Sequence, residues 1–428
     1  QQTIGRGFHV KRTIASLVVF VMTMVLLSAS SVSMASTTEK QKVVLYNNKI
    51  EIVDALNQMA AAYNASHEGV ELVIDTTGSD DYATTLKTRF AGGDEPDIFV
   101  ITGTEQMMLW MENLEDLSDQ PWVSDMVDVA KPNITYEGKV YGFPVGIEGY
   151  GLMYNKDLFA KAGIDKIPIT TEELSAASDK LKAAGIAYPF VETYGSWYQA
   201  GMFFFSSALA QQDDPSAFID GLNNGTETIV GNKAFIGLAD MIKVDYAGCE
   251  SPLNTDFSAQ VSAFGSGTSA IAGGGTWNQP TLDAANPSLN CGLMPYPITA
   301  DAAKNDVLYA GVTNYWAVNK NSPAKDAAKD FLKWLVTDAE GQHYLTTGMV
   351  NIPAFKSVPV DNKAIGQLGQ SLYEYLSAGK TLGIYNSRYT FAAAEAFGTA
   401  IQKYGAGMID QDEFLKELQA AWDENKSA

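Results

Sequence analysis

Aromatic side chains gather in one stretch of this 428-residue chain and recur beside glycines further along. Residues 194–205 read YGSWYQAGMFFF, and a tryptophan and an asparagine follow three consecutive glycines at 273–275. Flat rings can stack on the C–H faces of a sugar, while planar amides and carboxylates bind its hydroxyls. This combination predicts a binding site for a neutral carbohydrate. Its candidate contacts are Tyr194, Trp197, Tyr198, Trp277 and Asn278.

Polar side chains follow each of the first three predicted strands, at 42–46, 70–75 and 96–100. Ligands of open α/β sheets bind beyond the carboxyl ends of the strands. We therefore expect these loops to contribute further contacts. The candidates are Asn47, Asn48, Asp80, Thr104 and Glu105, with Lys49, Asp81 and Thr102 beside them.

Several of these candidates have an equally simple structural interpretation. Trp277 could pack inside its own domain, and residues 203–205 beside Trp197 are predicted to be core. Tyr315 and Trp316 alternate on a predicted strand, so one faces the core and the other is a candidate contact. Arg388 is a candidate whose alternative is a salt bridge near the C-terminus.

Residue patterns typical of catalysis are missing from the sequence. After residue 35 only His67 and His343 remain, and neither has a second His or Cys at metal-ligand spacing. No G-x-S-x-G elbow, Walker loop or G-x-G-x-x-G after a strand occurs. Fifty acidic residues make carboxylate pairs inevitable, so such pairs do not indicate a glycosidase. We expect no enzyme, no metal and no cofactor.

Strand and helix patterns alternate along the first hundred residues after the N-terminal segment. A helical stripe at 50–64 and a helix beginning near Asp80 separate the three strands named above. A β-α-β-α-β order implies a mostly parallel sheet covered by helices on both faces. The chain is also too long for one ordinary core, which favours two domains.

Residues 136–163 read YEGKVYGFPVGIEGYGLMYNKDLFAKAG, which predicts two short strands joined by a glycine-rich bend and then a helix capped by Asn155. The pattern G-K-x-Y-G-x-P…L-x-Y-N-K-D-L-F-x-x-A-G closely resembles the first interdomain crossover of the extracellular solute-binding proteins (family 1) of ABC transporters. The AGGDEPDI run at 91–98, the FGSGTSAIAGGGTW run at 264–277 and the second crossover-like run at 309–320 extend the resemblance. It covers nearly all of residues 42–428.

This resemblance implies an α/β chain with the two-lobed type II periplasmic-binding-protein fold and a ligand cleft between the lobes. Lobe one is expected to comprise residues 42–146 and 311–356. Lobe two is expected to comprise residues 149–308 and 360–428. The chain crossings between the lobes would act as hinges that close around a ligand.

The resemblance also assigns roles to individual residues. Maltodextrin-binding relatives use a crossover glutamate seven residues before the asparagine of Y-N-K-D, and Glu148 holds that place before Asn155. Its alternative is a hinge salt bridge or a strand cap. Trp277 matches the tryptophan on which those relatives stack sugar. Their tryptophan beyond the third strand is absent here, since Ile101 and Thr102 stand there, which argues against a maltodextrin ligand.

The N-terminal 35 residues read as an export signal. A basic start precedes an apolar run at 14–27, and Ser33-Met34-Ala35 fits a cleavage site, with a retained signal anchor as the alternative. No lipobox cysteine follows, so we expect a periplasmic or secreted protein. The resemblance implies a monomer that delivers its ligand to the membrane permease subunits of an ABC importer.

The charge of the chain restricts its partners. Residues 1–35 carry three cations and no acid, so their removal takes the net charge from −21 to −24. Such a surface repels nucleic acid and anionic lipid. Only Arg89 and Arg388 remain among the arginines, which argues against a dedicated anion receptor.

Three questions stay open at the level of sequence. Cys249 and Cys291 could form one disulfide or remain as two core thiols. Acidic loops with aromatics would also suit a polyamine or another cationic ligand. A secreted glycan-active enzyme or lectin-like module is the alternative from a different class.

Overall fold

A computed structural model describes residues 40–426 of the protein, and the sheets and helices below all belong to the unit that begins at Gln41. The predicted signal peptide, residues 1–35, lies outside the described residues. Among the helices of residues 40–426, none is long and apolar enough to cross a membrane.

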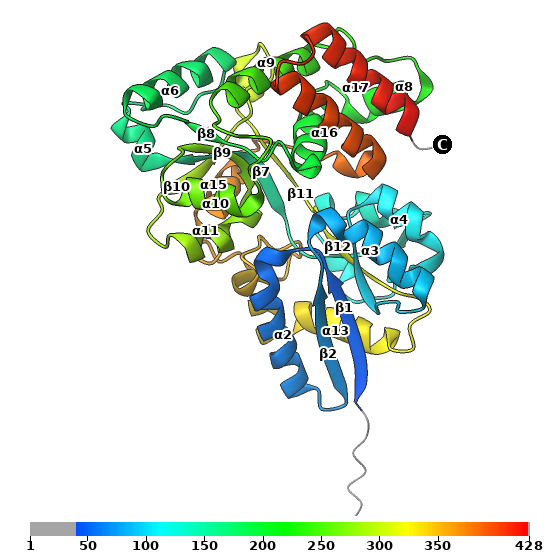
Figure 1. Cartoon of the computed structure of the whole chain (residues 1–428). Helices are drawn as coiled ribbons and strands as arrows, with labels where there is room; N and C mark the ends of the chain where they lie inside the picture. The colour runs from blue at the N-terminus through cyan, green and yellow to red at the C-terminus, as the bar shows by residue number, and fades with distance from the viewer. Residues whose placement is uncertain (1–39, 427–428) are drawn as a thin grey trace, which may run out of the picture. The chain divides into compact units, whose positions relative to one another are not determined.

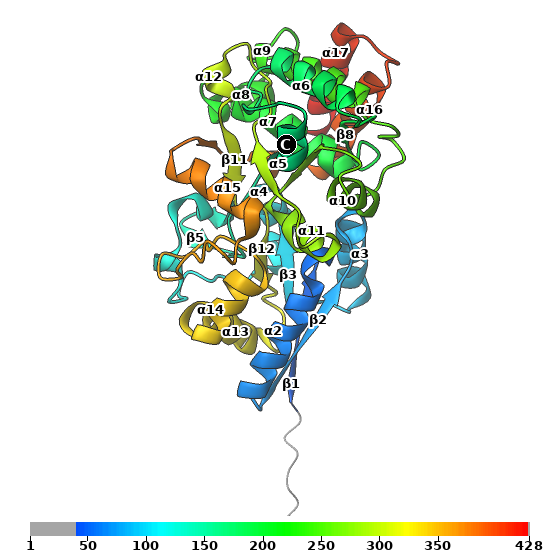
Figure 2. The ribbon, with the colours of Figure 1, turned by 90° about the vertical axis from the view of Figure 1, so that its left-hand side faces the viewer.

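The first sheet has five strands in the order β2-β1-β3-β12-β6. Their bounds are Gln41–Asn47 (β1), Val70–Thr76 (β2), Ile98–Ile101 (β3), Phe143–Pro144 (β6) and Tyr315–Val318 (β12). The strands β1, β2 and β3 run parallel, whereas β12 pairs antiparallel with both β3 and β6. The accompanying helices are α2 (Val53–Ser66), α3 (Ser79–Gly92), α4 (Thr104–Trp110), α13 (Lys325–Thr337) and α14 (Ala339–His343) (Figures 1 and 2). We call this part lobe one.

The second sheet is built around the long crossover strand β7, Glu148–Asn155. Its order is β13-β11-β7-β9-β8, with β10 also paired to β7. The bounds are Phe190–Val191 (β8), Ile271–Gly275 (β9), Cys291–Met294 (β10), Leu308–Gly311 (β11) and Thr381–Leu382 (β13). We call this sheet and its helices lobe two.

Most of the helices within residues 40–426 belong to lobe two. They are α5 (Lys156–Lys161), α6 (Thr171–Ala183), α7 (Phe205–Ala210), α8 (Pro215–Asn224), α9 (Lys233–Ala247), α10 (Phe257–Gly265), α11 (Gln279–Ala285), α12 (Ala302–Asn305), α15 (Gly366–Ser377), α16 (Phe391–Gly405) and α17 (Gln411–Asn425). In Figure 2, α15 lies beside β11, with which it is in contact, while α13 and α14 accompany lobe one.

The two sheets divide the strands at almost the sequence positions predicted for the lobes. The departure is β11, which pairs with β7 up to Gly311, so the second crossing begins after that glycine and leads directly into β12. The lobe boundaries themselves stay a prediction. What the strand pairing adds is that the chain passes between the sheets at β6–β7, at β11–β12 and again between β12 and β13. The first two of these passages are called the crossings below.

Local signals explain several helix ends. Asn155 Oδ1 accepts a hydrogen bond from the Leu158 amide at 3.0 Å, so this predicted cap is confirmed. Thr170 Oγ1 caps α6 in the same way. Gly93 ends α3 with a positive φ of 75°, a conformation that glycine adopts without steric cost. The helix predicted from residue 50 begins instead as a short 3-10 turn, Ile50–Ile52.

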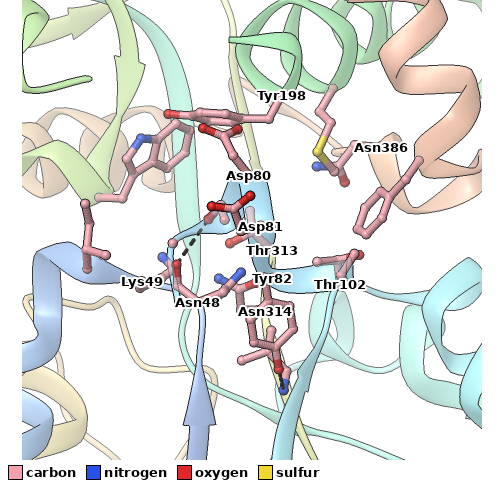
Figure 3. Close-up of a pocket in the computed structure, with 18 of the residues that line it drawn as sticks. Asn48, Lys49, Asp80, Asp81, Tyr82, Thr102, Tyr198, Thr313, Asn314 and Asn386 are labelled. Carbon is pink, nitrogen blue, oxygen red and sulfur yellow. Dashed lines mark hydrogen bonds between the residues drawn. The ribbon is translucent and has the colours of Figure 1, made fainter. Parts of the chain in front are cut away.

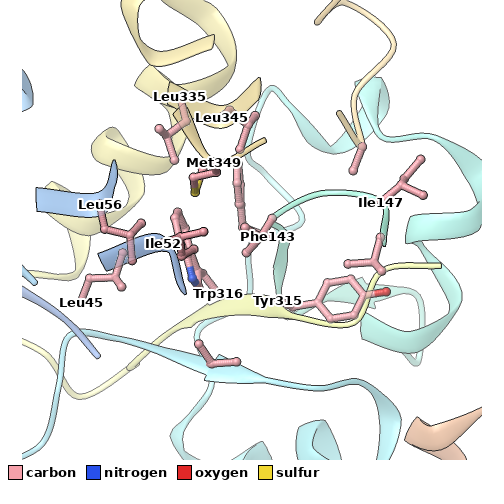
Figure 4. Close-up of a cluster of buried hydrophobic side chains, with 14 of the residues drawn as sticks. Leu45, Ile52, Leu56, Phe143, Ile147, Tyr315, Trp316, Leu335, Leu345 and Met349 are labelled. Atoms are coloured by element: carbon pink, nitrogen blue, oxygen red, sulfur yellow. The ribbon is translucent and has the colours of Figure 1, made fainter. Parts of the chain in front are cut away.

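Tyr315 and Trp316 both lie in the apolar core of lobe one. Each has an exposed fraction of 1% or less. Trp316 packs between Phe143 and Phe331, with ring centroids 6.1 and 6.2 Å away. Figure 4 shows both side chains among buried residues of this lobe.

The two cysteines are free thiols. Cys249 follows α9, where its Sγ lies 3.4 Å from the Asp245 carbonyl oxygen, and Cys291 is buried at the start of β10. The structure therefore has the two unpaired thiols rather than the disulfide that was the other alternative.

Candidate ligand-binding site

A cavity of about 280 Å³ has lining residues from lobe one, lobe two and both crossings. Figure 3 shows Tyr198, from lobe two, facing polar side chains that lobe one and the crossings contribute. The carboxyl ends of β1 and β3 and the start of α3 all reach this cavity, as expected for an open α/β sheet.

Lobe one contributes a mainly polar surface, which we call the polar wall. Its residues follow β1, begin α3 or follow β3. The polar side chains are Asn48, Lys49, Glu51, Ser79, Asp80, Asp81, Thr102 and Gln106. Glu51 is nearly enclosed, and burial raises its pKa although Lys49, 3.9 Å away, opposes this effect.

The loop after β1 contains a side-chain acceptor that has no hydrogen-bond partner among the described residues. Asn47 is buried and donates from Nδ2 to the Lys49 carbonyl at 2.7 Å and to Thr76 Oγ1 at 3.3 Å, so it fixes the loop from behind. Ser79 Oγ donates to the Asn48 carbonyl at 3.2 Å. The side-chain Oδ1 of Asn48 is buried and has no hydrogen-bond partner among residues 40–426. A buried acceptor of this kind is costly unless a ligand or water donates to it.

Lobe two contributes an aromatic surface, which we call the aromatic wall. It consists of Trp197, Tyr198, Phe203, Phe257, Trp277 and Phe391. The Trp277 ring stacks on Phe203, with centroids 4.9 Å apart and planes 25° from parallel. Its six-membered ring lies so close to the Gly275 backbone that a Cβ there would collide with it. The glycine run therefore gives the Trp277 indole room to lie against the end of β9.

Figure 3 also shows how side chains from the crossings enter the cavity between the two walls. Glu148 forms an ion pair with Lys49 and accepts a hydrogen bond from Thr313, which lies on the other crossing. Glu148 thus connects both crossings to lobe one, and it also lines the cavity. Glu148 therefore forms the salt bridge that was its alternative, and its role as a ligand contact stays a prediction.

Four other predicted contacts lie outside this cavity. Tyr194 is 1% exposed and packs edge-on against Tyr246 at 5.2 Å. Asn278 is buried and accepts from the Gly275 amide at 3.1 Å, so it supports the turn that carries Trp277. Tyr315 and Trp316 are both core residues, because β12 is a central strand with both faces covered. The expectation that one of them would face the ligand is not realised.

Three further predicted contacts come together elsewhere. Thr104, Glu105 and Arg388 line a second cavity of about 200 Å³, between the start of α4 and the C-terminal helices. Arg388 also lies 3.6 Å from Asp220, so it makes the salt bridge that was its alternative.

Sequence reasoning missed several cavity residues. Thr313 and Asn314 immediately precede Tyr315 in the predicted second crossing. That position could have identified them as cavity residues. Tyr82 lies on α3 two residues after Asp80, and its spacing does not distinguish it from the core side chain Leu86 of the same helix. Phe257 and Phe391 each begin a helix, and nothing local distinguishes them from core residues.

Metal ligation finds no support in the part of the chain that the structure describes. Within it, no three His, Cys, Asp or Glu side chains are grouped so as to hold a metal ion. The chemistry that this cavity offers is hydrogen bonding to hydroxyls along one wall and stacking along the other.

The sequence also matches a known protein family. The pattern described as bacterial extracellular solute-binding protein matches residues 48–342. The melibiose/raffinose/stachyose-binding protein of Bacillus subtilis is 25% identical over 363 residues, which are 77% of this chain and 80% of that protein. The maltotriose-binding protein of Pyrococcus abyssi is 26% identical over 330 residues, covering 74% of this chain and 67% of that protein.

Solved structures resemble the fold over almost its whole length. A sugar transporter protein of Bacillus licheniformis, solved in complex with stachyose, superposes with a TM-score of 0.72 at 20% identity. The match covers 89% of this chain and 98% of that one. This likeness confirms the predicted two-lobed α/β fold.

Proposed function

Because this chain belongs to the bacterial extracellular solute-binding proteins, we propose that it is the receptor of an ABC importer for a neutral oligosaccharide. It captures the sugar outside the cytoplasm, as a monomer, and delivers it to membrane permease subunits without chemical change. The observation that supports this function most is the pairing of an aromatic wall with a polar wall across one cavity. The sugars in the names of the relatives agree with this ligand class.

The two walls match the two kinds of surface that a sugar ring presents. The C–H face of one ring packs on Trp277, whose position against Phe203 fixes its plane. Hydroxyls of the ligand donate to Asn48 Oδ1 and to the carboxylates of Asp80 and Asp81. Lys49 is already paired with Glu148, so the described residues that line the cavity leave no free cation for an anionic ligand.

The ligand contacts are divided between the two lobes, which favours closure of the lobes around the ligand. A ligand that touches both walls binds the closed form better and so favours it. Ser196 Oγ of lobe two donates to Asp80 Oδ1 of lobe one at 3.4 Å, a contact that opening would break. The crossings near Gly146 and Gly311 are the proposed hinges. Gly149 is less suitable, because its amide donates to Thr276 Oγ1 and it lies inside the β7 ladder.

A cationic ligand is the second candidate, and one observation favours it. Within residues 40–426, the lining of the cavity has four carboxylates, of Glu51, Asp80, Asp81 and Glu148, but one lysine. An ammonium group between these carboxylates and an aromatic ring would also be stabilised.

Isothermal titration calorimetry of the mature protein separates these functions. The ligands are raffinose, stachyose, maltotriose and spermidine. After incubation with the protein, each sugar is analysed by chromatography for hydrolysis products. We expect saturable 1:1 binding of at least one oligosaccharide, an unchanged sugar and a smaller radius of gyration by X-ray scattering on saturation. Binding of spermidine alone would establish the cationic candidate, and release of shorter sugars would establish an enzyme.

A further inference from the structure

A seven-residue π-helix, η6 (Tyr198–Phe204), leads directly into α7. Its backbone hydrogen bonds join residues five apart instead of four apart, an arrangement that is rare and is found frequently at functional sites. Tyr198, Met202 and Phe203 all line the main cavity, and Figure 3 shows Tyr198 among its lining residues. The π-helix therefore supplies a large part of the surface that lobe two presents to the ligand.

The wider turn of the π-helix decides which of its side chains share a face. In an α-helix, residues five apart lie about 140° apart around the axis, and only residues three or four apart are neighbours. Tyr198 and Phe203 are five apart, yet their rings pack edge to face with centroids 6.2 Å apart. Phe203 stacks in turn on Trp277. The π turn thus connects Tyr198 through Phe203 to the Trp277 ring.

The junction between η6 and α7 has a cost in backbone hydrogen bonds. Where the bonding changes from five residues apart to four, two successive amides reach carbonyls two residues apart, so one carbonyl is skipped. Tyr389 Oη donates to the carbonyls of Gly201 and Met202, at 3.0 and 2.8 Å. Tyr150 Oη donates to the Phe203 carbonyl at 3.2 Å. These buried hydroxyls supply donors for carbonyls at the junction and so stabilise the π form.

Close packing against α16 fixes the position of the π-helix. A Cβ on Gly201 would lie 1.8 Å from the Ala394 carbonyl oxygen, so the two helices meet backbone to backbone. At the other end of the contact, a Cβ on Gly398 would lie 3.1 Å from the Cα of Trp197. The rings that the π-helix presents to the cavity are therefore positioned relative to a second, longer helix.

We propose that Tyr389 is a positioning residue for ligand binding, which acts through the π-helix without touching the ligand. Its hydroxyl holds the carbonyls of Gly201 and Met202, and this keeps Tyr198 and Phe203 together on the cavity face. The proposal rests on the proposed function, because the ligand concerned is the sugar.

Two variants and a control test this role. Tyr389→Phe removes the hydroxyl and keeps the ring, which belongs to the core of lobe two. Deletion of Ala200 removes one residue from the π-helix, so that bonding four residues apart fits the shorter segment. Tyr309→Phe is the matched control, because Tyr309 is buried in the same lobe and its hydroxyl accepts from Gln211, outside the π-helix.

Calorimetry with raffinose, stachyose and maltotriose measures affinity, and urea denaturation measures stability. A readout without ligand is the near-ultraviolet circular dichroism of Trp277, obtained for each protein by subtracting the spectrum of its Trp277→Phe derivative. We expect Tyr389→Phe to weaken sugar binding about 5- to 10-fold, the size of one net hydrogen bond, and to reduce the Trp277 signal. Deletion of Ala200 should weaken binding at least about 30-fold, because the aromatic wall is rearranged. Tyr309→Phe should change stability but neither the affinity nor the Trp277 signal.

A Tyr389→Phe protein with lowered stability, unchanged affinity and an unchanged Trp277 signal overturns the positioning role, while the proposed function stands. If the deletion variant does not fold, Tyr389→Phe decides alone. If the wild-type protein binds none of these sugars, the proposed function fails. The Trp277 signal of Tyr389→Phe then supports the positioning role if it is reduced and overturns it if it is not.

Discussion

The two walls of the main cavity differ in chemistry and in how they are held. The polar wall of lobe one consists of loop and helix-start residues of unequal burial, from the exposed Asp80 and Asp81 to the buried Asn48. The aromatic wall of lobe two consists of rings that are packed on other rings, as Trp277 is on Phe203 and Trp197 is on Phe391.

Because of this difference, we expect the two walls to contribute differently to the affinity and to the selectivity of binding. Stacking on a rigid ring is tolerant of which sugar is bound, whereas hydrogen bonds depend on where each hydroxyl points. We therefore infer that the aromatic wall provides most of the binding free energy and that the polar wall distinguishes one sugar from another.

A layer of buried acid groups lies behind the aromatic wall. Glu192 follows β8 and accepts a hydrogen bond from the Gly273 amide of β9, the strand that leads to Trp277. Glu192 Oε2 and Asp245 Oδ2 are buried without a hydrogen-bond partner among the described residues. Burial raises the pKa of Glu192 well above its usual value and that of Asp245 to about 8.

The largest expected effect comes from removing the anchor of the aromatic wall. Trp277→Ala should weaken binding of every sugar ligand by about 2–4 kcal/mol, because a partly buried stacking ring is lost. Unfolding monitored by circular dichroism should stay close to wild type, since the turn is held by Asn278. Tyr188→Ala, an exposed aromatic outside the cavity, serves as the control. Unchanged affinity would reassign Trp277 to packing and remove the proposed difference between the walls.

The next largest effect is a pH-dependent change in stability caused by the buried acid groups behind the aromatic wall. A carboxyl whose pKa is higher in the folded than in the unfolded chain stabilises the fold at low pH. That stability is lost as the pH rises from about 4.5 towards the folded value. Glu192→Gln keeps the acceptor for Gly273 but cannot ionise. Its free energy of unfolding relative to wild type should therefore rise by about 1–2 kcal/mol between pH 5.5 and 7.5.

Urea denaturation at several pH values measures this difference. Glu173→Gln, on the surface at the start of α6, is the matched control and should show no such trend. A pH-independent difference for Glu192→Gln would show that the buried acids are not protonated when folded. The aromatic wall would then rest on a charged layer rather than a neutral one.

The smallest effect should come from the polar wall. Asn48→Ala removes the free acceptor and should cost about 1 kcal/mol of binding for sugars with a hydroxyl in that position, and less for others. Asn47→Ala is the paired comparison, because Asn47 holds the loop and faces away from the ligand. It should lower the melting temperature as well as the affinity. A uniform loss across all sugars for Asn48→Ala would contradict the selectivity of this wall.

Much of the fold could be predicted because its signals are local. Asn155 caps the helix that it was expected to cap, and the strands β1, β2 and β3 lie within a few residues of their predicted bounds. The crossover pattern identified the family, since its glycines, its one proline and its aromatics occupy a short and specific stretch.

The site was predicted less completely, because burial depends on what packs from elsewhere. Trp277 and Tyr315 look alike in sequence, as aromatics beside polar residues near a strand. The first lines the cavity and the second lies in the core of lobe one. Glycine spacing distinguished Trp277, but no local feature showed that β12 would be covered on both faces.

The sequence by itself determined the family, the alternation of strands and helices and most of the loops that reach the cavity. Those properties depend on residues close together in the chain. Only the tertiary structure decided that Glu148 meets Lys49 and Thr313, that Thr104 joins Arg388 in a separate cavity, and that Glu192 remains without a cation partner among the described residues. These outcomes depend on distances between segments tens to hundreds of residues apart, which are fixed by how the sheets and helices pack.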